Sequence, residues 1–594
     1  MARRGKLVLF LFALFTLTVV AIALLVFAVY RLGKPGVPEH TILEADFEKG
    51  VVEYVPVDPI AQILHEHQPV VRDLVEALER GADDERVVGF IARIGSSGMG
   101  MARLQELRDA VAAFGESGKP TVAWSETFGE FGPGTGAYYL ATAFDEIYLQ
   151  PSGDVNLTGF AAENPFLRGT LDKLGVVPRM DHRYEYKNAM NLFTEEKLTE
   201  PHREAMQALL DSWFDQLVTG VAEGRKKTPE EVRELIDRGP FLGPEALEAG
   251  LVDGLAYRDE VYANLRQRVG EDAELLYLYP YLQRAGRPHD HGETIALIYG
   301  VGGVARGSNQ YDPLRGTTTM GSDSVTAAFR EAIDDDSVRA ILFRVDSPGG
   351  SYVASDAIWR ETVRAKDAGK PVIVSMGDVA GSGGYFVAMN ADKIVAQPGT
   401  ITGSIGVLGG KLVTREMWKK VGITFDGVQA GADATIYSSV EDYSEQGWER
   451  FQAWLDRVYE DFTAKVADGR DLPLDTVRDV AKGRIWSGTD AEQLHLIDAV
   501  GGFPVALDLA RQAAGLEPTA DVKLAVYPRE RNPWAKIFGE PAASSEQETA
   551  ITLAVRAIET LRPVVRFAER TGLISERQEL EVPFVPQVDG PPSW

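Results

Sequence analysis

The stretch Gly381–Gly406 reads GSGGYFVAMNADKIVAQPGTITGSIG, and an earlier stretch, Gly134–Gly159, reads GTGAYYLATAFDEIYLQPSGDVNLTG. The two align without a gap over Gly-x-Gly-x-Tyr-aromatic-x-Ala, then Asp-x-Ile, then Gln-Pro, so that Ser382 lies over Thr135. Self-similarity of this kind indicates an internal repeat. We infer that the chain contains one domain twice.

The similarity extends on both sides of these stretches. Upstream, DDDSVRAILFRVDSPGG aligns with DDERVVGFIARIGSSGM and brings Arg344 over Arg93, and downstream GTDAEQLHLIDAVGG aligns with GPEALEAGLVDGLA. A Gly-, Pro- and charge-rich join between the copies is typical of a linker. The predicted domains are residues 1–36 (cytoplasmic stub and membrane anchor), 37–282 (N-terminal repeat), 283–293 (linker), 294–533 (C-terminal repeat) and 534–594 (a helix and a Pro-rich tail).

Each copy alternates short β-branched runs with helical stretches. In the second copy the predicted strands are Ala340–Val345, Pro371–Ser375 and Lys393–Ala396, and the predicted helices are Ser324–Ile333, Ser351–Ala368 and Gly384–Asn390. This alternation is typical of βαβ units and of a parallel sheet covered on both faces. A longer amphipathic helix follows in each copy, over Glu200–Arg225 and Ser444–Arg470. The expected fold class is therefore α/β.

Composition excludes several classes of protein. A chain of 594 residues, 45% of them hydrophobic, exceeds what one core usually supports. The formal net charge of −27 argues against nucleic acid as a partner, because phosphate binding needs a basic face. The absence of cysteine removes disulfides, thiolate nucleophiles and Cys-ligated zinc. The eight remaining candidates for a soft-metal ligand or a His base are His40, His65, His67, His182, His202, His289, His291 and His495.

The N-terminus predicts a membrane anchor. Leu7–Tyr30 contains 24 residues without a charge, which is long enough to cross a bilayer as a helix and too long for the apolar region of a signal peptide. No small-x-small cleavage site follows it. Three basic residues precede the span and two follow it closely, so the positive-inside rule favours a cytoplasmic N-terminus.

Two glycine-rich loops of the second copy are candidates for chemistry. Ser382 follows a strand and precedes a helix, a position that suits either a turn residue or an exposed nucleophile. The loop Asp346–Gly350 has two glycines where the first copy reads IGSSGM, and its bare amides suit either a plain turn or half of an oxyanion hole. Gly383, the residue after the serine, is the expected source of the second amide.

A serine nucleophile needs a base. His495 overlays Gly250 of the first copy, which indicates a turn at a helix end. The better candidate is Lys187 in RYEYKNAMNLF, whose counterpart is Ala432. Spacing alone favours a solvated surface lysine. A neutral lysine requires burial to lower its pKa by about three units, and Glu185 would oppose this if its carboxylate lay close.

The motifs RVDSPGG, GSGGYF, QPGTITGSIGV and YKNAMNLF, found together in a duplicated chain with an N-terminal apolar span, resemble the signal peptide peptidase A family in its long two-repeat form. The resemblance implies tandem Clp protease/crotonase-like domains. It also implies that Ser382 is the nucleophile, Lys187 the general base, Ser404 the residue that holds the lysine amine, and Gly350 and Gly383 the oxyanion-hole amides. No cofactor or metal is expected. Gly381 stands where the family usually has alanine.

The resemblance further implies a function and a location. The expected enzyme is a membrane-anchored serine endopeptidase that cleaves remnant signal peptides and other hydrophobic peptides through an acyl-enzyme. It would assemble as a homo-oligomer, a tetramer by resemblance, on the bacterial inner membrane. A single span at residues 7–30 would leave the catalytic bulk on the periplasmic side.

Three other readings remain open at this point. A crotonase-type acyl-CoA enzyme shares the fold and the Gly-Gly oxyanion hole, and a catalytically weak membrane scaffold would keep the fold alone. A zinc hydrolase would use HEH at His65–His67 or HDH at His289–His291, but these i, i+2 pairs differ from the i, i+4 spacing of common zinc hydrolases. Polar loop residues are the simpler reading of both.

Overall fold

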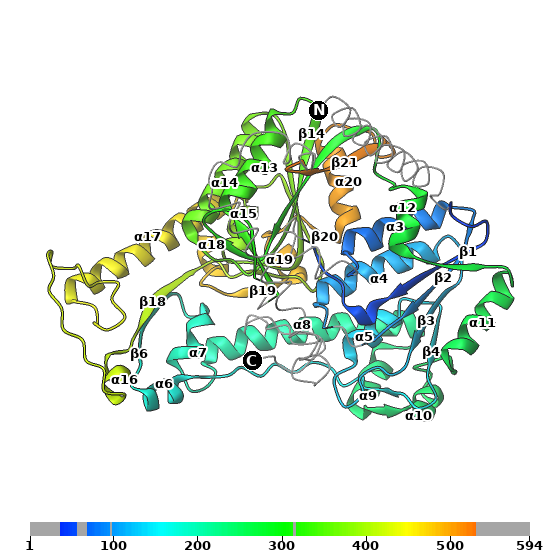
Figure 1. The fold of residues 1–594 in the computed structure, drawn as a ribbon, viewed down its shortest axis with the longest axis horizontal. Coiled ribbons are helices and arrows are strands. Elements are labelled where there is room, and N and C mark those ends of the chain that lie inside the picture. Colours follow the sequence, from blue (N-terminus) through cyan, green and yellow to red (C-terminus); the bar gives the residue numbers. More distant parts are fainter. Residues whose placement is uncertain (1–35, 56–67, 96–97, 313–315, 530–594) are drawn as a thin grey trace, which may run out of the picture.

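The computed structural model describes residues 36–55, 68–95, 98–312 and 316–529. Within these ranges it forms two α/β units that lie side by side, joined by a long helix along one edge (Figure 1). The predicted anchor at Leu7–Tyr30 and the predicted C-terminal helix and tail lie outside the described residues. Among the described helices, none combines the length and hydropathy needed to span a bilayer.

The first unit is built on a six-stranded sheet of order β8-β4-β3-β2-β1-β9, in which every neighbouring pair is parallel. Its strands are β1 (Thr41–Asp46), β2 (Val87–Arg93), β3 (Thr121–Ser125), β4 (Glu146–Leu149), β8 (Gly254–Leu255) and β9 (Glu274–Tyr277). The helices α3 (Val71–Asp83), α4 (Met101–Gly115), α5 (Thr135–Ala141) and α12 (Leu278–Ala285) pack on one face, and α11 (Arg258–Val269) packs on the other. Successive strand residues point to opposite faces of the sheet. Because helices cover both faces, the strand residues on both are apolar.

The second unit repeats this plan. Its sheet has the order β19-β17-β15-β14-β10-β21, with β16 paired to β15 and β20 paired to β16. Among the described strand pairs of this sheet, only β17–β19 is antiparallel. The strands are β10 (Glu293–Val301), β14 (Val338–Ser347), β15 (Val372–Gly381), β16 (Lys393–Ala396), β17 (Ile401–Gly403), β19 (Ile485–Ser487), β20 (Ala499–Val500) and β21 (Val522–Tyr527). The helices α13 (Ser322–Asp334), α14 (Tyr352–Asp367) and α15 (Gly383–Ala388) cover one face, and α20 (Phe503–Ala513) covers the other.

Most predicted elements are confirmed. The helix α8 spans Glu200–Arg225 as predicted, because Thr199 caps its first turn and Pro201 suits its start. The helix α17 (Glu445–Gly469) is capped by Ser444. Two strands were predicted too short. The strand β14 spans Val338–Ser347, beyond the predicted Ala340–Val345, and β15 continues beyond Ser375 to Gly381, since its far end pairs with β17 after a shift in register against β14.

The two units contact each other at two places that bear on function. The strand β6 (Val177–Arg183) of the first unit pairs antiparallel with β18 (Val407–Val413) of the second, with Arg183 opposite Val407 (Figure 1). This pairing brings the chain just after β6 next to the chain just before β18. Arg344, whose side chain is 2% exposed, pairs with Glu53 and Glu106 of the first unit. The units are therefore joined by the backbone hydrogen bonds of a strand pair and by buried ion pairs.

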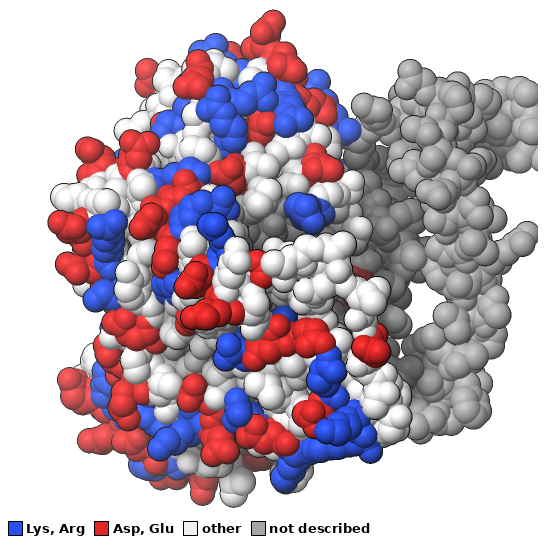
Figure 2. All heavy atoms as spheres, turned by 90° about the vertical axis from the view of Figure 1, so that its left-hand side faces the viewer, with Lys and Arg blue, Asp and Glu red and all other residues white. Residues whose placement is uncertain are grey.

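Short elements complete the described chain. They are the 3-10 turns η1 (Phe47–Lys49) and η2 (Asn188–Met190), the strands β5 (Asp154–Val155), β7 (Phe241–Leu242), β11 (Gly303–Ala305), β12 (Gln310–Asp312) and β13 (Thr317–Gly321), and the helices α6 (Arg168–Leu174), α7 (Asn191–Thr194), α9 (Pro229–Arg238), α10 (Gly243–Glu248), α16 (Arg415–Lys420), α18 (Leu474–Val480) and α19 (Gly488–Gln493). On the face shown in Figure 2, acidic and basic side chains are interspersed.

Candidate active site

Ser382 stands at a sharp change of direction between β15 and α15. It is the N-cap residue of α15, with φ 54° and ψ −116°, a conformation that non-glycine residues rarely adopt. Its own N–H donates to the carbonyl of Gly403 (2.9 Å), which ties the turn to β17. Strain of this kind clusters at functional sites. The geometry therefore singles out Ser382, which is half-buried, as a candidate nucleophile.

Lys187 reaches the serine from the other half of the chain. It follows β6 at the start of η2, and only 6% of the residue is exposed. Its Nζ lies 3.0 Å from Ser382 Oγ, 2.9 Å from Ser404 Oγ and 2.7 Å from the Ser404 carbonyl oxygen. The surface-lysine reading is wrong. The structure brings together the hydroxyl and the amine that the duplication distributes between the two copies.

Burial sets the charge of this amine. Removal from water disfavours the ammonium form, which lowers the pKa of Lys187 to about 7. Glu185, the carboxylate that would have opposed the shift, is exposed. A substantial fraction of Lys187 is thus neutral near pH 7, as a general base must be.

Two segments of the second half hold the lysine. Ser404, at φ 51°, donates its N–H to the Arg484 carbonyl (2.7 Å), and this places both of its oxygens toward the amine. Gly483, at φ 81°, lies against the lysine backbone so closely that an added Cβ would stand 2.5 Å from Lys187 Cβ. Sequence reasoning missed Gly483. The available signal was that the first copy has Arg238 at the matching position, so that the glycine belongs to the second copy alone.

The two predicted oxyanion amides lie side by side. A Cβ added to Gly383 would stand 3.0 Å from the amide nitrogen of Gly350. Gly349, at φ 100°, accepts from the N–H of Val304 (2.8 Å), which holds the loop open beside the serine. Within the described residues, neither the Gly350 nor the Gly383 N–H has a hydrogen-bond acceptor. Two free donors near the Ser382 hydroxyl suit the binding of an oxyanion.

The matching positions of the first copy carry no such site. Thr135 is fully buried and donates its hydroxyl to the Gly159 carbonyl (3.1 Å). In the second copy, Ala432 is exposed in a loop. His495 has φ 57° just after α19, and its counterpart Gly250 has φ 67°, so the reading of His495 as a helix-end turn residue is confirmed. Each half therefore supplies one part of a single site.

Of the two histidine motifs, HDH lies within the described residues. No group of three or more His, Cys, Asp or Glu side chains within the described ranges is arranged to hold a metal ion. In HDH, His289 pairs with Glu79 (3.2 Å) and His291 with Asp290 (2.7 Å). The HEH motif at His65–His67 lies outside the described residues.

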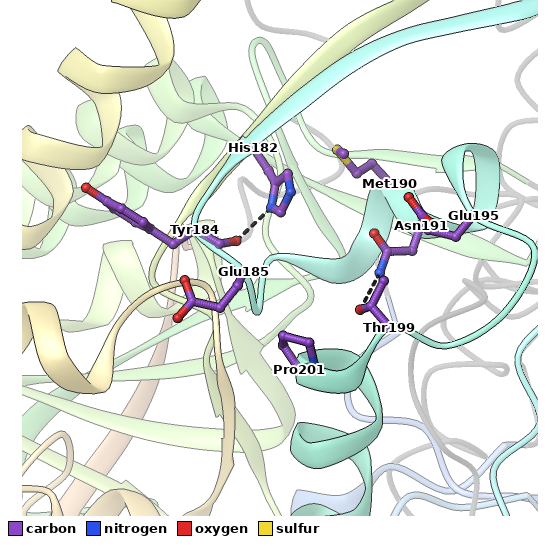
Figure 3. Close-up of a pocket in the computed structure, with 8 residues that line it drawn as sticks. All are labelled: His182, Tyr184, Glu185, Met190, Asn191, Glu195, Thr199 and Pro201. Atoms are coloured by element: carbon purple, nitrogen blue, oxygen red, sulfur yellow. Dashed lines mark hydrogen bonds between the residues drawn. The ribbon is translucent and has the colours of Figure 1, made fainter.

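A pocket of about 440 Å³ adjoins the turn that carries Lys187. Figure 3 shows residues of β6 and the following turn on one side and residues of α7 and the start of α8 on the other, and the full lining is His182, Tyr184, Glu185, Met190, Asn191, Glu195, Thr199 and Pro201. His182 Nδ1 bonds the Tyr184 carbonyl (2.6 Å), and Asn191 donates to Thr199 (3.4 Å). The lining of the pocket thus combines apolar, polar and acidic side chains.

Comparison with known proteins gives consistent matches. A family model described as "Peptidase family S49" matches residues 113–272 and 364–517. The chain is 32% identical over 463 residues to "Serine protease SPPA, chloroplastic" of Arabidopsis thaliana, covering 76% of this chain and 67% of that protein. It is 31% identical to "Protease 4" of Salmonella typhi, covering 75% of this chain and 72% of that protein. It is also 31% identical to "Protease 4" of Haemophilus influenzae, covering 77% and 75%.

Proposed function

From the premise that this chain belongs to peptidase family S49 and is a serine protease of the long, two-repeat SPPA form, we propose that Ser382 is its nucleophile and Lys187 its general base. The observation that carries the proposal is the 3.0 Å contact between Lys187 Nζ and Ser382 Oγ. At this distance the amine and the hydroxyl form a direct hydrogen bond, along which a proton can be transferred. The pKa of Lys187 near 7 supports the same assignment.

The first chemical step follows from this contact. Neutral Lys187 takes the hydroxyl proton of Ser382 as the serine oxygen attacks the peptide carbonyl. The amides of Gly350 and Gly383 donate to the oxyanion that forms. The lysine ammonium then gives its proton to the departing amine, and the acyl group remains on Ser382.

The second step hydrolyses the acyl-enzyme. Lys187, neutral again, takes a proton from water as the water attacks the ester carbonyl. The same two amides hold the second oxyanion. Ser404 keeps the amine aimed at the serine oxygen throughout, because its hydroxyl and its carbonyl both bond Nζ.

The proposed substrates are hydrophobic peptides, including remnant signal peptides left in the membrane. The apolar span at Leu7–Tyr30 supports this, because it would tether the enzyme where such peptides concentrate. The accompanying proposal is a single-pass protein of the bacterial inner membrane, with a cytoplasmic N-terminus and a periplasmic catalytic part. A Clp protease/crotonase-like fold for each repeat and a homo-oligomeric, tetrameric assembly belong to the same proposal.

The test compares matched variants of the full-length protein in detergent. Ser382→Ala and Lys187→Met should each lower the hydrolysis of a fluorogenic hydrophobic peptide by at least about a thousandfold. Lys370→Met is the control, because Lys370 is also partly buried and donates to backbone carbonyls, of Ala332 and Asp335, away from the site. A chelator should have no effect.

Three outcomes would contradict the proposal. Near wild-type hydrolysis by Lys187→Met would remove the lysine from the mechanism. Loss of activity with the chelator, or turnover of acyl-CoA in place of peptide, would point to a different chemistry.

A further inference from the structure

A cluster of charged side chains lies directly behind the candidate site, where the two halves meet. Arg103 of α4 extends from the first half toward β14 and β15 of the second. Its Nη2 lies 2.9 Å from Asp378 Oδ2 and 3.4 Å from Asp346 Oδ2. All three side chains are largely buried. The guanidinium of a residue in the first half therefore bridges two strands of the second half.

The two aspartates mark an irregularity in the sheet. Val345 pairs with Met376 and Ser347 pairs with Ala380, so the three residues Gly377–Val379 of β15 face Asp346 alone. The Asp346 carboxylate fills this gap by accepting the N–H of Val379 (3.0 Å). A bulge of this kind re-aims the strand that carries it.

The irregularity sets the geometry of the candidate site because β14 and β15 both end at that site. Four residues after Asp346 the chain reaches Gly350, and four residues after Asp378 it reaches Ser382. A change in how β14 and β15 meet at the bulge would move the oxyanion amides relative to the serine oxygen.

The bulge needs a cation. Two buried carboxylates at one point repel each other, and burial followed by the charge of Asp378 raises the pKa of Asp346 to about 7. The charge of Arg103 acts in the opposite direction. Leaving such carboxylates without their partner is strongly unfavourable.

The backbone of α4 is tied to the same place. Its N-cap residue, Gly100, has no side chain to bond the first turn, and the carboxylate of Asp378 accepts the N–H of Arg103 (2.8 Å) instead. A Cβ on Gly100 would stand 2.2 Å from Asp378 Cγ. The second half thus supplies the cap of α4, and a carboxylate is favourable at a helix N-terminus.

We propose that Arg103 is a positioning residue of the serine protease site: by binding Asp346 and Asp378 together, it holds the strand ends that carry Gly350 and Ser382 in their working arrangement. The inference rests on the proposed function of Ser382 and goes beyond it. The first half of the chain then contributes the alignment of the nucleophile and the oxyanion amides in addition to the base.

The test uses the full-length protein in detergent and measures two quantities. These are the rate at which a fluorophosphonate labels Ser382, and kcat and KM for a fluorogenic hydrophobic peptide. Arg103→Met should slow labelling and lower kcat by about 10- to 100-fold, with KM changed less than about twofold, because the reacting atoms are misaligned while substrate binding persists. Arg103→Lys should recover part of the loss, since it keeps the charge but carries a compact ammonium in place of the planar guanidinium.

Arg225→Met is the matched control. The Arg225 side chain is 8% exposed and donates two bonds to Asp253 far from the site. This variant should lose thermal stability and keep the wild-type labelling rate. Wild-type labelling by Arg103→Met, with only a lower melting temperature, would overturn the proposal.

Two milder variants keep the test decisive if Arg103→Met does not fold. Arg103→Lys and Asp378→Asn should both be slowed by at least about threefold in labelling. Wild-type rates in both would overturn the positioning role. A wild-type protein that the fluorophosphonate does not label at Ser382 would instead contradict the proposed function itself.

Discussion

Lys187 Nζ lies 3.0 Å from Ser382 Oγ although 195 positions separate the two residues in the chain. The contact exists because β6 of the first half pairs with β18 of the second and brings the segments beside them together. The amine comes from the first copy and the hydroxyl from the second, and together they form one candidate site. The proposed activity belongs to the duplicated chain as a whole.

The burial of Lys187 predicts how stability depends on pH. Its pKa falls from 10.5 to about 7 on folding, so between these values the unfolded chain binds more protons than the folded one. The free energy of unfolding that this group contributes must therefore rise with pH across this window, by up to about 1.4 kcal/mol per pH unit.

Lys187→Met lacks this contribution. Urea unfolding at pH 7, 8 and 9 should show the wild type gaining stability relative to the variant at each step. Equal pH dependence in both proteins would mean that the amine stays charged in the folded state.

Ser404→Ala should lower kcat by about tenfold and leave KM nearly unchanged. The hydroxyl bond to Nζ (2.9 Å) is lost, but the backbone carbonyl bond (2.7 Å) remains and keeps the lysine roughly in place. Steady-state peptide hydrolysis measures the effect. An unchanged kcat would show that the carbonyl alone orients the amine.

Gly383→Ala keeps the amide N–H but should displace it, and so should lower kcat by about a hundredfold, the usual effect of disabling one oxyanion donor. The new Cβ would stand 2.6 Å from Ser355 Oγ and 3.0 Å from the Gly350 nitrogen, and so it would crowd both amides. Combining it with Ser355→Ala relieves only the first contact and should restore little activity. Full recovery in this double variant would place the defect in packing and not in the oxyanion site.

His495→Gly should keep wild-type kcat. The residue has φ 57°, a backbone conformation that glycine adopts without strain, so the free energy of unfolding should stay equal or rise by up to about 1 kcal/mol. Peptide hydrolysis together with thermal unfolding tests both statements. A large loss of activity would identify the histidine as a base and displace Lys187 from that role.

Much of the fold could be predicted because its signals are local. The bounds of α8 follow from Thr199 and Pro201 at its start, and the alternation of apolar runs identifies the parallel strands. The extension of β15 was missed, because Gly377 and Asp378 are residue types that strands usually avoid. They are tolerated here because the bulge removes them from regular pairing with β14.

The site could be predicted in part for a similar reason. Comparing the copies singled out Ser382 against Thr135 and Lys187 against Ala432, but spacing alone did not assign a base, and the motif resemblance was needed. Gly483 and the Arg103–Asp378 pair were missed because their importance lies in contacts between the halves. Arg103 and Asp378 are 275 positions apart, and no local pattern reports such a contact.

The most direct test of the Lys187–Ser382 pairing is the rate of fluorophosphonate labelling of Ser382 measured from pH 5 to pH 9. The rate for the wild type should rise about tenfold per pH unit at low pH and level off above pH 7, where the lysine becomes neutral. Lys187→Met should be labelled slowly at every pH, without that inflection. An inflection near pH 7 that persists in Lys187→Met would contradict the assignment of the lysine as the base.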